Sequence, residues 1–594
     1  MTDRPLGAHV SRGKTRFAVR APRASALWLC LFGDESERRV AMTRDGECWT
    51  AVLPGDLSGA RYGYRAEGEW APDRGLWFDP AKLLVDPHAL ILDRRFVADP
   101  RLAQYGEDTA EIVPRAIVPG PLPRPRRRKP RFVRGDLIYE INVRAFTMLH
   151  PDVPQHQRGT VAALAHPAVL AHLKKIGVGA VELMPITAWI DERHLPPLGL
   201  SNAWGYNPVA LMALDPGLCP GGLAELAEAV AALHKGGIGV ILDLVFNHTG
   251  ESDVHGPVLS LRGLDNAAYA YAPDGRLIND TGCGNTLDFA QTAVRELVLD
   301  ALRHFVRHAG VDGFRFDLAT IMARGPGFSA QAPIFAAIAA DPWLADRVLI
   351  AEPWDIGPGG YQLGQFPRGW LEWNDRFRDD VRRFWRGDGT VGALATRLAG
   401  SSDLFGADCR SVNFLAAHDG FTLADSVAYA HRHNHANGED NRDGHGENFS
   451  WNCGTEGPTD DAQVVAARQA DVRALLGTLF ASTGTIMLTA GDEMGRSQHG
   501  NNNAYAQDNA AFWIDWQGRD TALEDHVAAL ARARRERRFA PASFPQPGAW
   551  LAPDGRDMTA ADWDDPATDG FTYRPHGLGC ALEVSRSGRR ADWL

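Results

Sequence analysis

The sequence predicts an α/β protein built on a (β/α)8 TIM barrel, with a β-sandwich before the barrel and a short β-domain after it. Three observations support this prediction. Residues 9–66 alternate between apolar and polar side chains with closely spaced turns, residues 113–130 are rich in proline, and residues 132–516 contain eight apolar strand-like runs separated by helical segments. Short alternating runs are typical of a sandwich, and repeated strand–helix units are typical of a barrel.

The first part of the chain, residues 1–112, is expected to form the β-sandwich. Turn sequences such as Asp45-Gly46 separate short runs in which apolar and polar side chains alternate. This alternation places one set of side chains on the buried face of a sheet. The predicted strands are residues 15–20, 26–32, 48–52 and 62–66. A lid attached to the following domain is the alternative interpretation.

A connector is predicted over residues 113–131, where proline recurs every few residues. Because proline lacks an amide N–H and has a fixed φ, this segment cannot continue a helix or a central strand. Its four consecutive basic residues, Arg126 to Lys129, have the composition of a nucleic-acid patch. Proline flanks them and the chain as a whole is acidic, so a solvated linker is favoured and no nucleic-acid partner is expected.

Residues 132–516 are expected to form the barrel. Their strand-like runs are almost continuously apolar, as parallel strands that are buried on both faces should be. Helical segments, such as residues 223–235 and 292–308, lie between the runs. A doubly wound open sheet is the alternative, but no glycine-rich phosphate loop follows the first strand. The predicted strands are residues 137–143, 180–184, 239–245, 313–317, 348–351, 370–373, 411–416 and 485–488.

Two connections within the barrel are too long to be simple turns. Residues 249–285 are rich in Gly, Asp and Tyr, and residues 425–461 are rich in His, Asn, Asp and Gly. Long ordered loops on a barrel usually build the substrate site, whereas disorder is the alternative. Residues 517–594 are expected to form a helix over residues 523–534 and then a partial β-domain, because the sequence stops within a strand-like pattern.

Composition and charge argue against several classes of protein. The formal charge of −12 is spread along 594 residues, which gives no sign of nucleic-acid binding. No apolar run is long enough to cross a bilayer and the first residues lack a signal pattern, so no membrane partner is expected. The seven cysteines are scattered without metal-ligand or redox spacing, which predicts reduced thiols in the cytoplasm. The 17 Trp and 11 Tyr suit carbohydrate contacts, although core packing uses the same residues.

The candidate chemistry lies at the carboxyl ends of four predicted strands. Arg315 and Asp317 alternate with Phe side chains, so the two charged groups share one face of their strand. A single Arg–x–Asp pair is more often a structural ion pair. In a barrel, however, the four strand ends meet at one mouth, and a cluster of acids there is costly without a function. The polar and aromatic residues at these ends are Asp243, Asn247, His248, Arg315, Asp317, Glu352, Trp354, His418 and Asp419.

These four strand ends resemble the signature regions of the α-amylase superfamily, glycoside hydrolase family 13. Residues 182–186, Glu-Leu-Met-Pro-Ile, resemble its additional signature at the second strand. Other stretches are similar to the isoamylase-like glycogen debranching enzymes, and residues 1–112 resemble their glycogen-binding module, carbohydrate-binding family 48. The stretches concerned are Gly63-Tyr-Arg-Ala, Phe78-Asp-Pro-Ala-Lys, Trp204-Gly-Tyr-Asn-Pro, Thr281-Gly-Cys-Gly-Asn, Glu372-Trp-Asn-Asp-Arg-Phe-Arg-Asp, Asn437-Gly-Glu-Asp-Asn-Arg-Asp-Gly and Gly491-Asp-Glu-Met-Gly-Arg.

The resemblance implies a retaining glycosidase, which needs a nucleophilic carboxyl and an acid/base carboxyl about 5–5.5 Å apart. It assigns Asp317 as the nucleophile, Glu352 as the acid/base and Asp419 as a third acid that holds the sugar hydroxyls. Arg315, on the same face as Asp317, is expected to keep the nucleophile ionised. Partial burial close to an anion is expected to keep Glu352 protonated at the start of the reaction.

Further residues are expected to contact the sugar or to orient the residues that do. Tyr206 offers an apolar platform, and His248 and His418 can hydrogen-bond the same ring. The substrate-binding residues implied by the resemblance are Tyr206, Asp243, His248, Arg315, His418 and Trp354. Asn247 matches a position that ligates calcium in some amylases, but no cage of carboxylates and carbonyls is evident. Neither a metal nor a cofactor is therefore predicted.

The function that the resemblance implies is hydrolysis of α-1,6 branch linkages in glycogen or a related branched α-glucan. The closest alternative is a transglycosylase on the same barrel, such as a branching enzyme or 4-α-glucanotransferase. An inactive glycan-binding scaffold is less favoured because the three acids are intact. Linkage selection is expected from residues 201–208 and 425–461, since the acids recur across the superfamily.

A second role is expected for the N-terminal module. The resemblance suggests that residues 1–112 hold polymeric glycan through exposed aromatic rings such as Trp28, Trp49 or Trp70. Large aromatic side chains also fill protein cores, so the alternative is that the module only braces the barrel and that these rings are buried.

Overall fold

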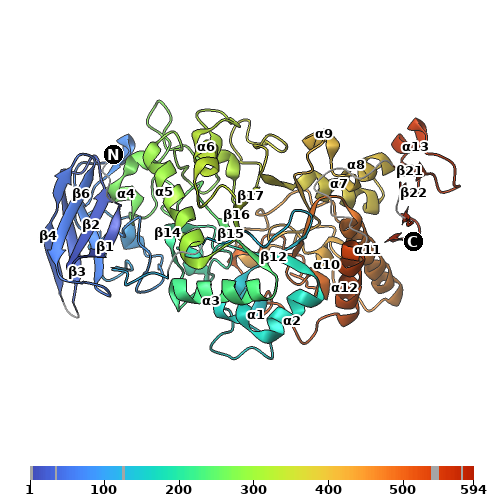
Figure 1. Cartoon of the computed structure of the whole chain (residues 1–594), viewed down its shortest axis with the longest axis horizontal. Coiled ribbons are helices and arrows are strands. Elements are labelled where there is room, and N and C mark those ends of the chain that lie inside the picture. Colours follow the sequence, from blue (N-terminus) through green and yellow to red (C-terminus); the bar gives the residue numbers. More distant parts are fainter. Residues whose placement is uncertain (1–4, 34–35, 124–126, 537–547, 577–578, 594) are drawn as a thin grey trace.

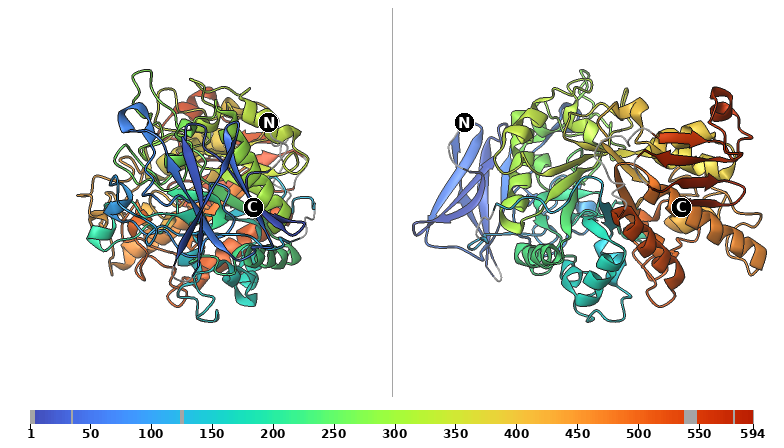
Figure 2. Two further views of the ribbon diagram at one scale, coloured as in Figure 1. Left: turned by 90° about the vertical axis from the view of Figure 1, so that its left-hand side faces the viewer. Right: turned by 45° about the vertical axis from the view of Figure 1, so that its right-hand side comes forward.

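The computed structural model describes residues 5–33, 36–123, 127–536, 548–576 and 579–593. The N-terminal sandwich lies at one end of the molecule, the barrel in the middle and the C-terminal sheet at the other end (Figure 1). A view turned by 45° keeps the same order, so the three parts follow one another along the long axis (Figure 2).

Two antiparallel sheets form the sandwich within the described residues. The four strands predicted for this part are all present, with ends that differ from the prediction by two residues or fewer. One sheet contains β1 (Gly7–Ser11), β2 (Lys14–Arg20), β6 (Cys48–Pro54) and β5 (Thr43–Asp45), and the other contains β10 (Ala116–Ile117), β7 (Arg61–Glu67), β3 (Ala26–Phe32) and β4 (Glu37–Ala41). A short hairpin, β8 (Trp70–Ala71) and β9 (Leu76–Trp77), follows β7.

The proline-rich segment differs from the free linker expected over residues 113–131. Its first part enters the sandwich, because β10 pairs with β7 and places Ala116 opposite Tyr62. Ala116 is fully buried. On its other side β10 forms only an isolated bridge, between Ala116 and Leu92, so the prolines of the segment lie outside a continuous ladder, where a central strand would exclude them. Arg126, the first residue of the basic run, lies outside the described residues.

Eight parallel strands of the described residues close into the barrel, which confirms the predicted fold class. Each lies where the sequence predicts it, within two residues at either end. The first strand stops earlier than predicted because Asn142 caps a helix: its side chain accepts a hydrogen bond from the amide of Ala145. The strands are β11 (Leu137–Ile141), β12 (Val178–Leu183), β15 (Gly239–Leu244), β16 (Gly313–Phe316), β17 (Val348–Ala351), β18 (Leu371–Asn374), β19 (Ser411–Phe414) and β20 (Thr485–Thr489).

Helices surround the barrel strands. The helix predicted over residues 292–308 ends as an α-helix at His304 and continues as a π-helical turn to Ala309. None of the described helices has the length and apolar character needed to cross a bilayer. They are α1 (Val143–Thr147), α2 (Pro167–Lys175), α3 (Gly222–Lys235), α4 (Leu261–Leu264), α5 (Thr292–His304), α6 (Pro333–Ala340), α7 (Asp375–Arg386), α8 (Val391–Leu398), α9 (Ser402–Phe405), α10 (Leu423–Ser426), α11 (Ala462–Ala481), α12 (Thr521–Glu536) and α13 (Ala560–Asp564).

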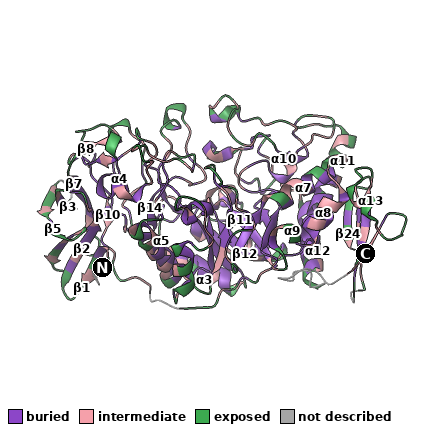
Figure 3. Cartoon of the chain, turned by 90° about the horizontal axis from the view of Figure 1, so that it is seen from above, coloured by how far each residue is buried: buried purple, intermediate pink, exposed green. Residues whose placement is uncertain are grey.

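Figure 3 shows that the strands of the barrel are buried. Their inward side chains form an apolar layer and a charged layer. Ile138, Ile241 and Met487 belong to the apolar cluster inside the strands. Two positions further along, in β11 and β15, the same faces carry Glu140 and Asp243, because side chains alternate with a period of two. The charged layer therefore lies at the carboxyl end of the barrel, where the long loops begin.

The sandwich shares its core with the barrel. Ile190, Val209 and Leu259 come from the barrel segment of the chain, but they belong to the same buried cluster as the sandwich strands. The N–H of Val85 donates to the carbonyl of Leu259 at 2.7 Å, which ties the two parts together at the backbone. An interface that is continuous with a core holds the module in a fixed position relative to the barrel. β13 (Thr187–Trp189) and β14 (Pro208–Leu214) line this junction.

The C-terminal part contains the predicted helix, present as α12, followed by an antiparallel sheet. The sheet has the order β21 (Gly548–Leu551), β22 (Gly570–Pro575), β23 (Leu582–Ser585) and β24 (Arg590–Trp593) in the described residues. It packs on α11 so closely that a Cβ added to Gly477 would lie 2.3 Å from the carbonyl oxygen of Ala591. A glycine is therefore needed at this contact.

Candidate active site

Arg315 is the centre of the candidate active site. β16 places its side chain inside the barrel, where it is fully buried. Its Nη1 lies 3.0 Å from both carboxylate oxygens of Asp243 and 3.1 Å from Oδ1 of Asp317. Its Nη2 lies 3.0 Å from Oε2 of Glu352. A buried guanidinium needs such partners, and here one planar group brings the predicted nucleophile and the predicted acid/base together.

Glu352 follows β17 and accepts a hydrogen bond of 2.7 Å from the N–H of Leu318. Leu318 has a φ of 39°, in the left-handed region that a bulky side chain rarely adopts. The strained residue directly after Asp317 thus aims its amide at Glu352. Burial raises the pKa of Glu352 to about 8, because it outweighs the opposing charge of Arg315 and is reinforced by Asp317. A general acid must start protonated, and this environment favours that state.

Asn247 holds Asp317, the predicted nucleophile. Its Nδ2 donates to Oδ2 of Asp317 at 2.7 Å and to the backbone carbonyl of Asp317 at 2.9 Å. With Arg315 on Oδ1 and Asn247 on Oδ2, both carboxylate oxygens of Asp317 are held by donors. The sequence suggested for Asn247 only a comparison with calcium ligands, whereas in the structure its amide group contacts Asp317 directly.

The two predicted histidines have different surroundings. His248 is buried, and its two ring nitrogens face oxygens of the protein, Oδ1 of Asn247 and the carbonyl of Tyr206. His248 therefore holds the backbone of Tyr206 and the side chain of Asn247 in place, and it has no free ring nitrogen for a sugar. His418 stacks on the Tyr206 ring at a centroid distance of 4.7 Å, and its Nδ1 lies 2.7 Å from Oε1 of Glu140.

The Glu140–His418 pair fixes the charge of the imidazole. Burial lowers the pKa of His418, but the ion pair with Glu140 outweighs it and raises the pKa to about 9. Glu182, on the neighbouring strand, is fully buried and neither carboxylate oxygen has a hydrogen-bond partner among the described residues. Burial, reinforced by Asp243 and Glu140, raises the pKa of Glu182 well above its usual value. Because a protonated Glu182 carries no charge, it adds no negative charge to the site. The positive charges of Arg315 and His418 then compensate only the acids that are ionised.

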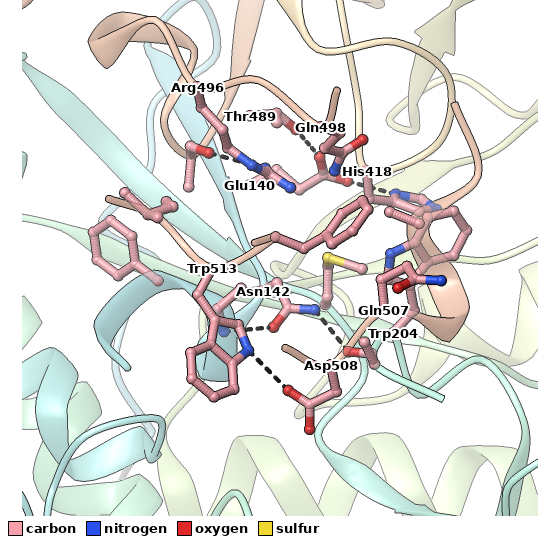
Figure 4. Close-up of a pocket in the computed structure, with 18 residues that line it drawn as sticks. Glu140, Asn142, Trp204, His418, Thr489, Arg496, Gln498, Gln507, Asp508 and Trp513 are labelled. Carbon is pink, nitrogen blue, oxygen red and sulfur yellow. Dashed lines mark hydrogen bonds and ion pairs between the residues drawn. The ribbon is translucent and has the colours of Figure 1, made fainter. Parts of the chain in front are cut away.

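A cavity lies behind His418, between β11, β20 and the loop that follows β20 (Figure 4). Figure 4 shows Glu140 with one oxygen toward His418 and the other toward Thr489. Trp204 stands edge-on to His418, with ring centroids 5.0 Å apart. The polar part of the lining also includes Asn142, Arg496, Gln498, Gln507 and Asp508. The cavity thus borders the imidazole of His418 together with its ion-pair partner Glu140.

Aromatic side chains line the site on two sides. Tyr206 is partly exposed, and its hydroxyl donates to Oδ2 of Asp243, which fixes the ring beside Arg315. This agrees with the expectation that Tyr206 forms a wall or platform. Trp354, two residues after Glu352, is also partly exposed and lies nearly parallel to Tyr361 at a centroid distance of 6.5 Å. Tyr361 is 46% exposed, so the pair offers an apolar surface on the acid/base side.

Asp419, the predicted third acid, follows β19 and is one-third exposed. Its Oδ2 lies 2.8 Å from Nε2 of His445, which comes from the long loop of residues 425–461. This loop is anchored by buried asparagines. Asn434 and Asn437 have no exposed surface and bond to residues of the loop after β20. The loop is therefore ordered, and the alternative of disorder is wrong for this segment.

The structure brings the predicted residues together at one mouth, with the exception that His248 lies behind the wall. Three functional contacts were missed: Asn247 with Asp317, Glu140 with His418, and His445 with Asp419. Glu140 had a visible signal, since it alternates with Ile138 and Asn142 along a strand that is otherwise apolar. His445 had none, because its contact depends on the path of a loop.

Comparisons with known proteins agree with this geometry. Residues 5–89 match the family Carbohydrate-binding module 48 (Isoamylase N-terminal domain). The glycogen debranching enzyme of Yersinia enterocolitica is 46% identical and the alignment covers 99% of this chain and 91% of that protein. The glycogen debranching enzyme of Serratia proteamaculans is 45% identical, with 94% of this chain and 88% of that protein covered.

Solved structures show the same fold at lower identity. The pullulanase of Anoxybacillus sp. LM18-11, complexed with maltotriose, superposes with a TM-score of 0.73 at 24% identity, covering 98% of this chain and 80% of that one. The type I pullulanase of Bacillus subtilis, complexed with maltose, has a TM-score of 0.72 at 22% identity, covering 99% and 79%. Because the curated relatives are 45–46% identical along nearly their whole length, the chain belongs to the glycogen debranching enzyme family.

Proposed function

We propose that this chain is a glycoside hydrolase that cleaves α-1,6 branch linkages of glycogen or a related branched α-glucan with retention of configuration. The observation that supports it most directly is the Arg315 guanidinium, which lies 3.1 Å from Asp317 and 3.0 Å from Glu352. Two carboxyl groups that share one cation but differ in environment suit the two roles of a retaining mechanism. The names of the curated relatives support the choice of substrate.

In the first step, a carboxylate oxygen of Asp317 attacks the anomeric carbon while the carboxyl proton of Glu352 passes to the glycosidic oxygen. The bond to the leaving chain breaks, and a glycosyl ester on Asp317 forms. In the second step, Glu352 takes a proton from water as the water attacks the same carbon, which releases Asp317. The two donors on Asp317, Arg315 and Asn247, stabilise the carboxylate when it leaves.

Asp419 has the role of gripping the sugar. One of its oxygens is held by His445, and the side chain is exposed enough to accept hydrogen bonds from ring hydroxyls. Interactions with these hydroxyls help catalysis when they strengthen as the ring distorts toward the transition state. We assign the leaving chain to the stacked pair Trp354 and Tyr361, because Trp354 follows Glu352 by two residues, and Tyr206 forms the wall near Arg315.

Linkage choice is assigned to the loops, because the three acids and Arg315 serve every linkage in the superfamily. The loop of residues 425–461 meets two other loops at the rim: the Tyr505 hydroxyl donates to Glu439 at 2.6 Å, and Nε2 of His194 lies 2.8 Å from the same hydroxyl. Three segments that are distant in sequence thus form one ordered edge of the mouth. An ordered edge can exclude a wrongly shaped branch, which a mobile loop cannot do.

The decisive experiment is to incubate the protein with glycogen and with its limit dextrin and to analyse chain lengths and linkages. Linear oligosaccharides with a loss of α-1,6 linkages, and no new branches, are expected. New branches or elongated chains would indicate a transglycosylase, either a branching enzyme or a 4-α-glucanotransferase. Binding without any change in the glycan would indicate a scaffold and would contradict the proposal.

The pH profile tests the acid role of Glu352. Its pKa is raised to about 8, so the protonated form persists through neutral pH and is lost as the pH rises through that value. We expect kcat/KM on a branched glucan to fall on the alkaline side with an apparent pKa near 8. Initial rates between pH 5 and 10, with the fold checked by circular dichroism at each pH, measure this limb. An alkaline limb at pH 5 to 6 would contradict the assignment.

One of the three aromatic residues that were expected to be exposed on the N-terminal module is buried. Trp49 is buried in the sandwich core with 6% exposure, so it braces the module and cannot bind glycan. Trp28 is partly buried and donates to Glu67. Trp70 packs against Tyr105, which is 59% exposed, beside an open cavity whose other wall includes Val254 of the barrel. Of the three predicted rings, Trp70 is best placed to meet a polymer.

Replacing Trp70 by Ala is therefore expected to lower kcat/KM on glycogen about 3- to 10-fold while leaving a short branched oligosaccharide nearly unaffected, because only the polymer reaches both sites. Rates on the two substrates, measured side by side, give the ratio. Val97→Ala, a change at an exposed apolar residue of the same module, is the matched control. An equal loss on both substrates would show that Trp70 only braces the barrel.

The cytoplasm is the compartment that we propose for this activity. All seven cysteines are free, and Cys30, Cys219 and Cys409 are buried as single thiols. Unpaired buried thiols are typical of proteins that work in a reducing compartment. The branched α-glucan is the partner proposed.

A further inference from the structure

The contact between His445 and Asp419 links the long loop of residues 425–461 to the candidate active site. The two residues are 26 positions apart, and Nε2 of His445 lies 2.8 Å from Oδ2 of Asp419. A carboxylate oxygen can only accept, so the imidazole donates this hydrogen bond. Hydrogen bonds with an ionised partner are shorter and stronger than neutral ones, and this distance is in their range.

Asn502 fixes both ends of this contact. Its Nδ2 donates to the backbone carbonyl of His445 at 2.9 Å, and its own carbonyl accepts the N–H of Gly420, also at 2.9 Å. Asn502 is 1% exposed. Gly444 adds a further constraint, since its φ is +76° and an added Cβ would lie 2.3 Å from Oδ1 of Asn502. The backbone on either side of the imidazole–carboxylate pair is therefore held in place before any substrate binds.

The second oxygen of Asp419 is left for a ligand. Among the described residues, Oδ1 of Asp419 accepts no hydrogen bond, whereas Oδ2 is held by His445. The side chain is 33% exposed, so a sugar hydroxyl can reach Oδ1. A carboxylate with one fixed oxygen and one open oxygen has a defined orientation toward the sugar, which a freely rotating side chain lacks.

Several charged groups face Asp419 from different elements. Burial alone would raise the pKa of Asp419, but the hydrogen bond and charge of His445 outweigh it and, with smaller contributions from His418 and Arg378, hold the pKa well below its usual range. Arg382 on α7 and Glu352 after β17 also interact with its charge.

We propose that His445 is a positioning residue for Asp419: it fixes Oδ2 so that Oδ1 faces the hydroxyl groups of the sugar. This inference rests on the proposed role of Asp419 in holding the sugar. It gives the loop of residues 425–461 a direct part in the chemistry, in addition to its part in shaping the rim. Disorder in this loop would then reduce catalysis as well as substrate choice.

Three variants test the inference. His445→Ala removes the donor, His445→Gln keeps an N–H donor near the position of Nε2, and His435→Ala changes an exposed histidine of the same loop. We expect His445→Ala to lower kcat/KM on a branched glucan about 10- to 100-fold, mostly through kcat, because a charge-assisted hydrogen bond is lost. His445→Gln should recover most of this loss, and His435→Ala should stay within about twofold of the unchanged protein.

The pH profile separates positioning from simple support of the fold. In His445→Ala the donor that lowers the pKa of Asp419 is absent, whereas burial still raises that pKa. As the pH falls, Asp419 should therefore become protonated at a higher pH than in the unchanged protein. The acid limb of kcat/KM in His445→Ala should therefore move upward, while the melting temperature changes little. Wild-type activity in His445→Ala overturns the inference. An equal loss in His445→Gln with an unchanged acid limb also overturns it, because that pattern belongs to a structural role.

A fourth variant distinguishes failure of this inference from failure of the proposed function. Asp419→Asn should lose far more activity than His445→Ala, because it removes the grip on the sugar itself. If Asp419→Asn is inactive and His445→Ala is unaffected, only the role of His445 is wrong. If a folded Asp419→Asn protein keeps its activity, the proposed site is wrong and the inference falls with it.

Discussion

Replacing Asp317 by Asn should reduce hydrolysis of a branched α-glucan by about four orders of magnitude or more, because an amide cannot form the glycosyl ester. The shape of the side chain is kept, and its oxygen can still accept from Nη1 of Arg315, now at 3.1 Å. The new NH2 group would then face Nδ2 of Asn247, which lies 2.7 Å from Oδ2 in the present protein. Two donors facing one another cost about 1–3 kcal/mol, so we expect a small loss of stability and a folded protein.

The measurement combines three readouts on purified Asp317→Asn. Reducing ends released from glycogen give the activity, thermal unfolding gives the stability, and calorimetric titration with a maltooligosaccharide gives the affinity, which should remain. Asp274→Asn is a matched control, since Asp274 is an exposed partner of Arg276 in the loop of residues 249–285. Substantial turnover by folded Asp317→Asn, free of contaminating enzyme, would remove Asp317 from the role of nucleophile.

The barrel could be predicted from the sequence because its strands are buried on both faces and therefore read as continuous apolar runs. Arg315 and Asp317 could be predicted for the same reason, since charges in such a strand need partners or a function. β10 could not be predicted, because an edge strand of two residues pairs through its backbone and leaves little trace in a proline-rich sequence. Trp49 was misassigned as exposed, although its alternation with Ala51, also buried, places both on the inner face.

The second-layer contacts of the site were the least predictable. Asn247 and Asp317 are 70 positions apart, and His418 and Glu140 are 278 positions apart, so their pairing follows only from closure of the barrel. His445 depends on a further condition, the fixed path of its loop, which is set by hydrogen bonds among Asn434 and Asn502. Residues in a polar loop have no periodicity that would indicate which side chain turns inward.

Replacing Glu352 by Gln should lower activity on glycogen about 100- to 10,000-fold, the usual contribution of a general acid. Gln keeps an oxygen for the N–H of Leu318, which now lies 2.7 Å from Oε2, so the strained backbone after Asp317 should be retained. The amide has no proton to give and cannot deprotonate water. The loss therefore depends on the leaving group, in contrast to the loss in Asp317→Asn.

An α-maltooligosyl fluoride tests this dependence, because fluoride leaves without a proton from the enzyme. With this donor, formation of the glycosyl ester by Glu352→Gln should be nearly as fast as in the unchanged protein, and hydrolysis of the ester should become the slow step. Fluoride release by Glu352→Gln should show a fast burst followed by a slow steady-state rate. The rate of the burst should not fall near pH 8, because the titrating carboxyl group is gone. Gln362→Glu, a charge change in the same βα loop, is the control for altered electrostatics. Equal losses on glycogen and on the fluoride, without a burst, would assign Glu352 to a role other than that of the acid.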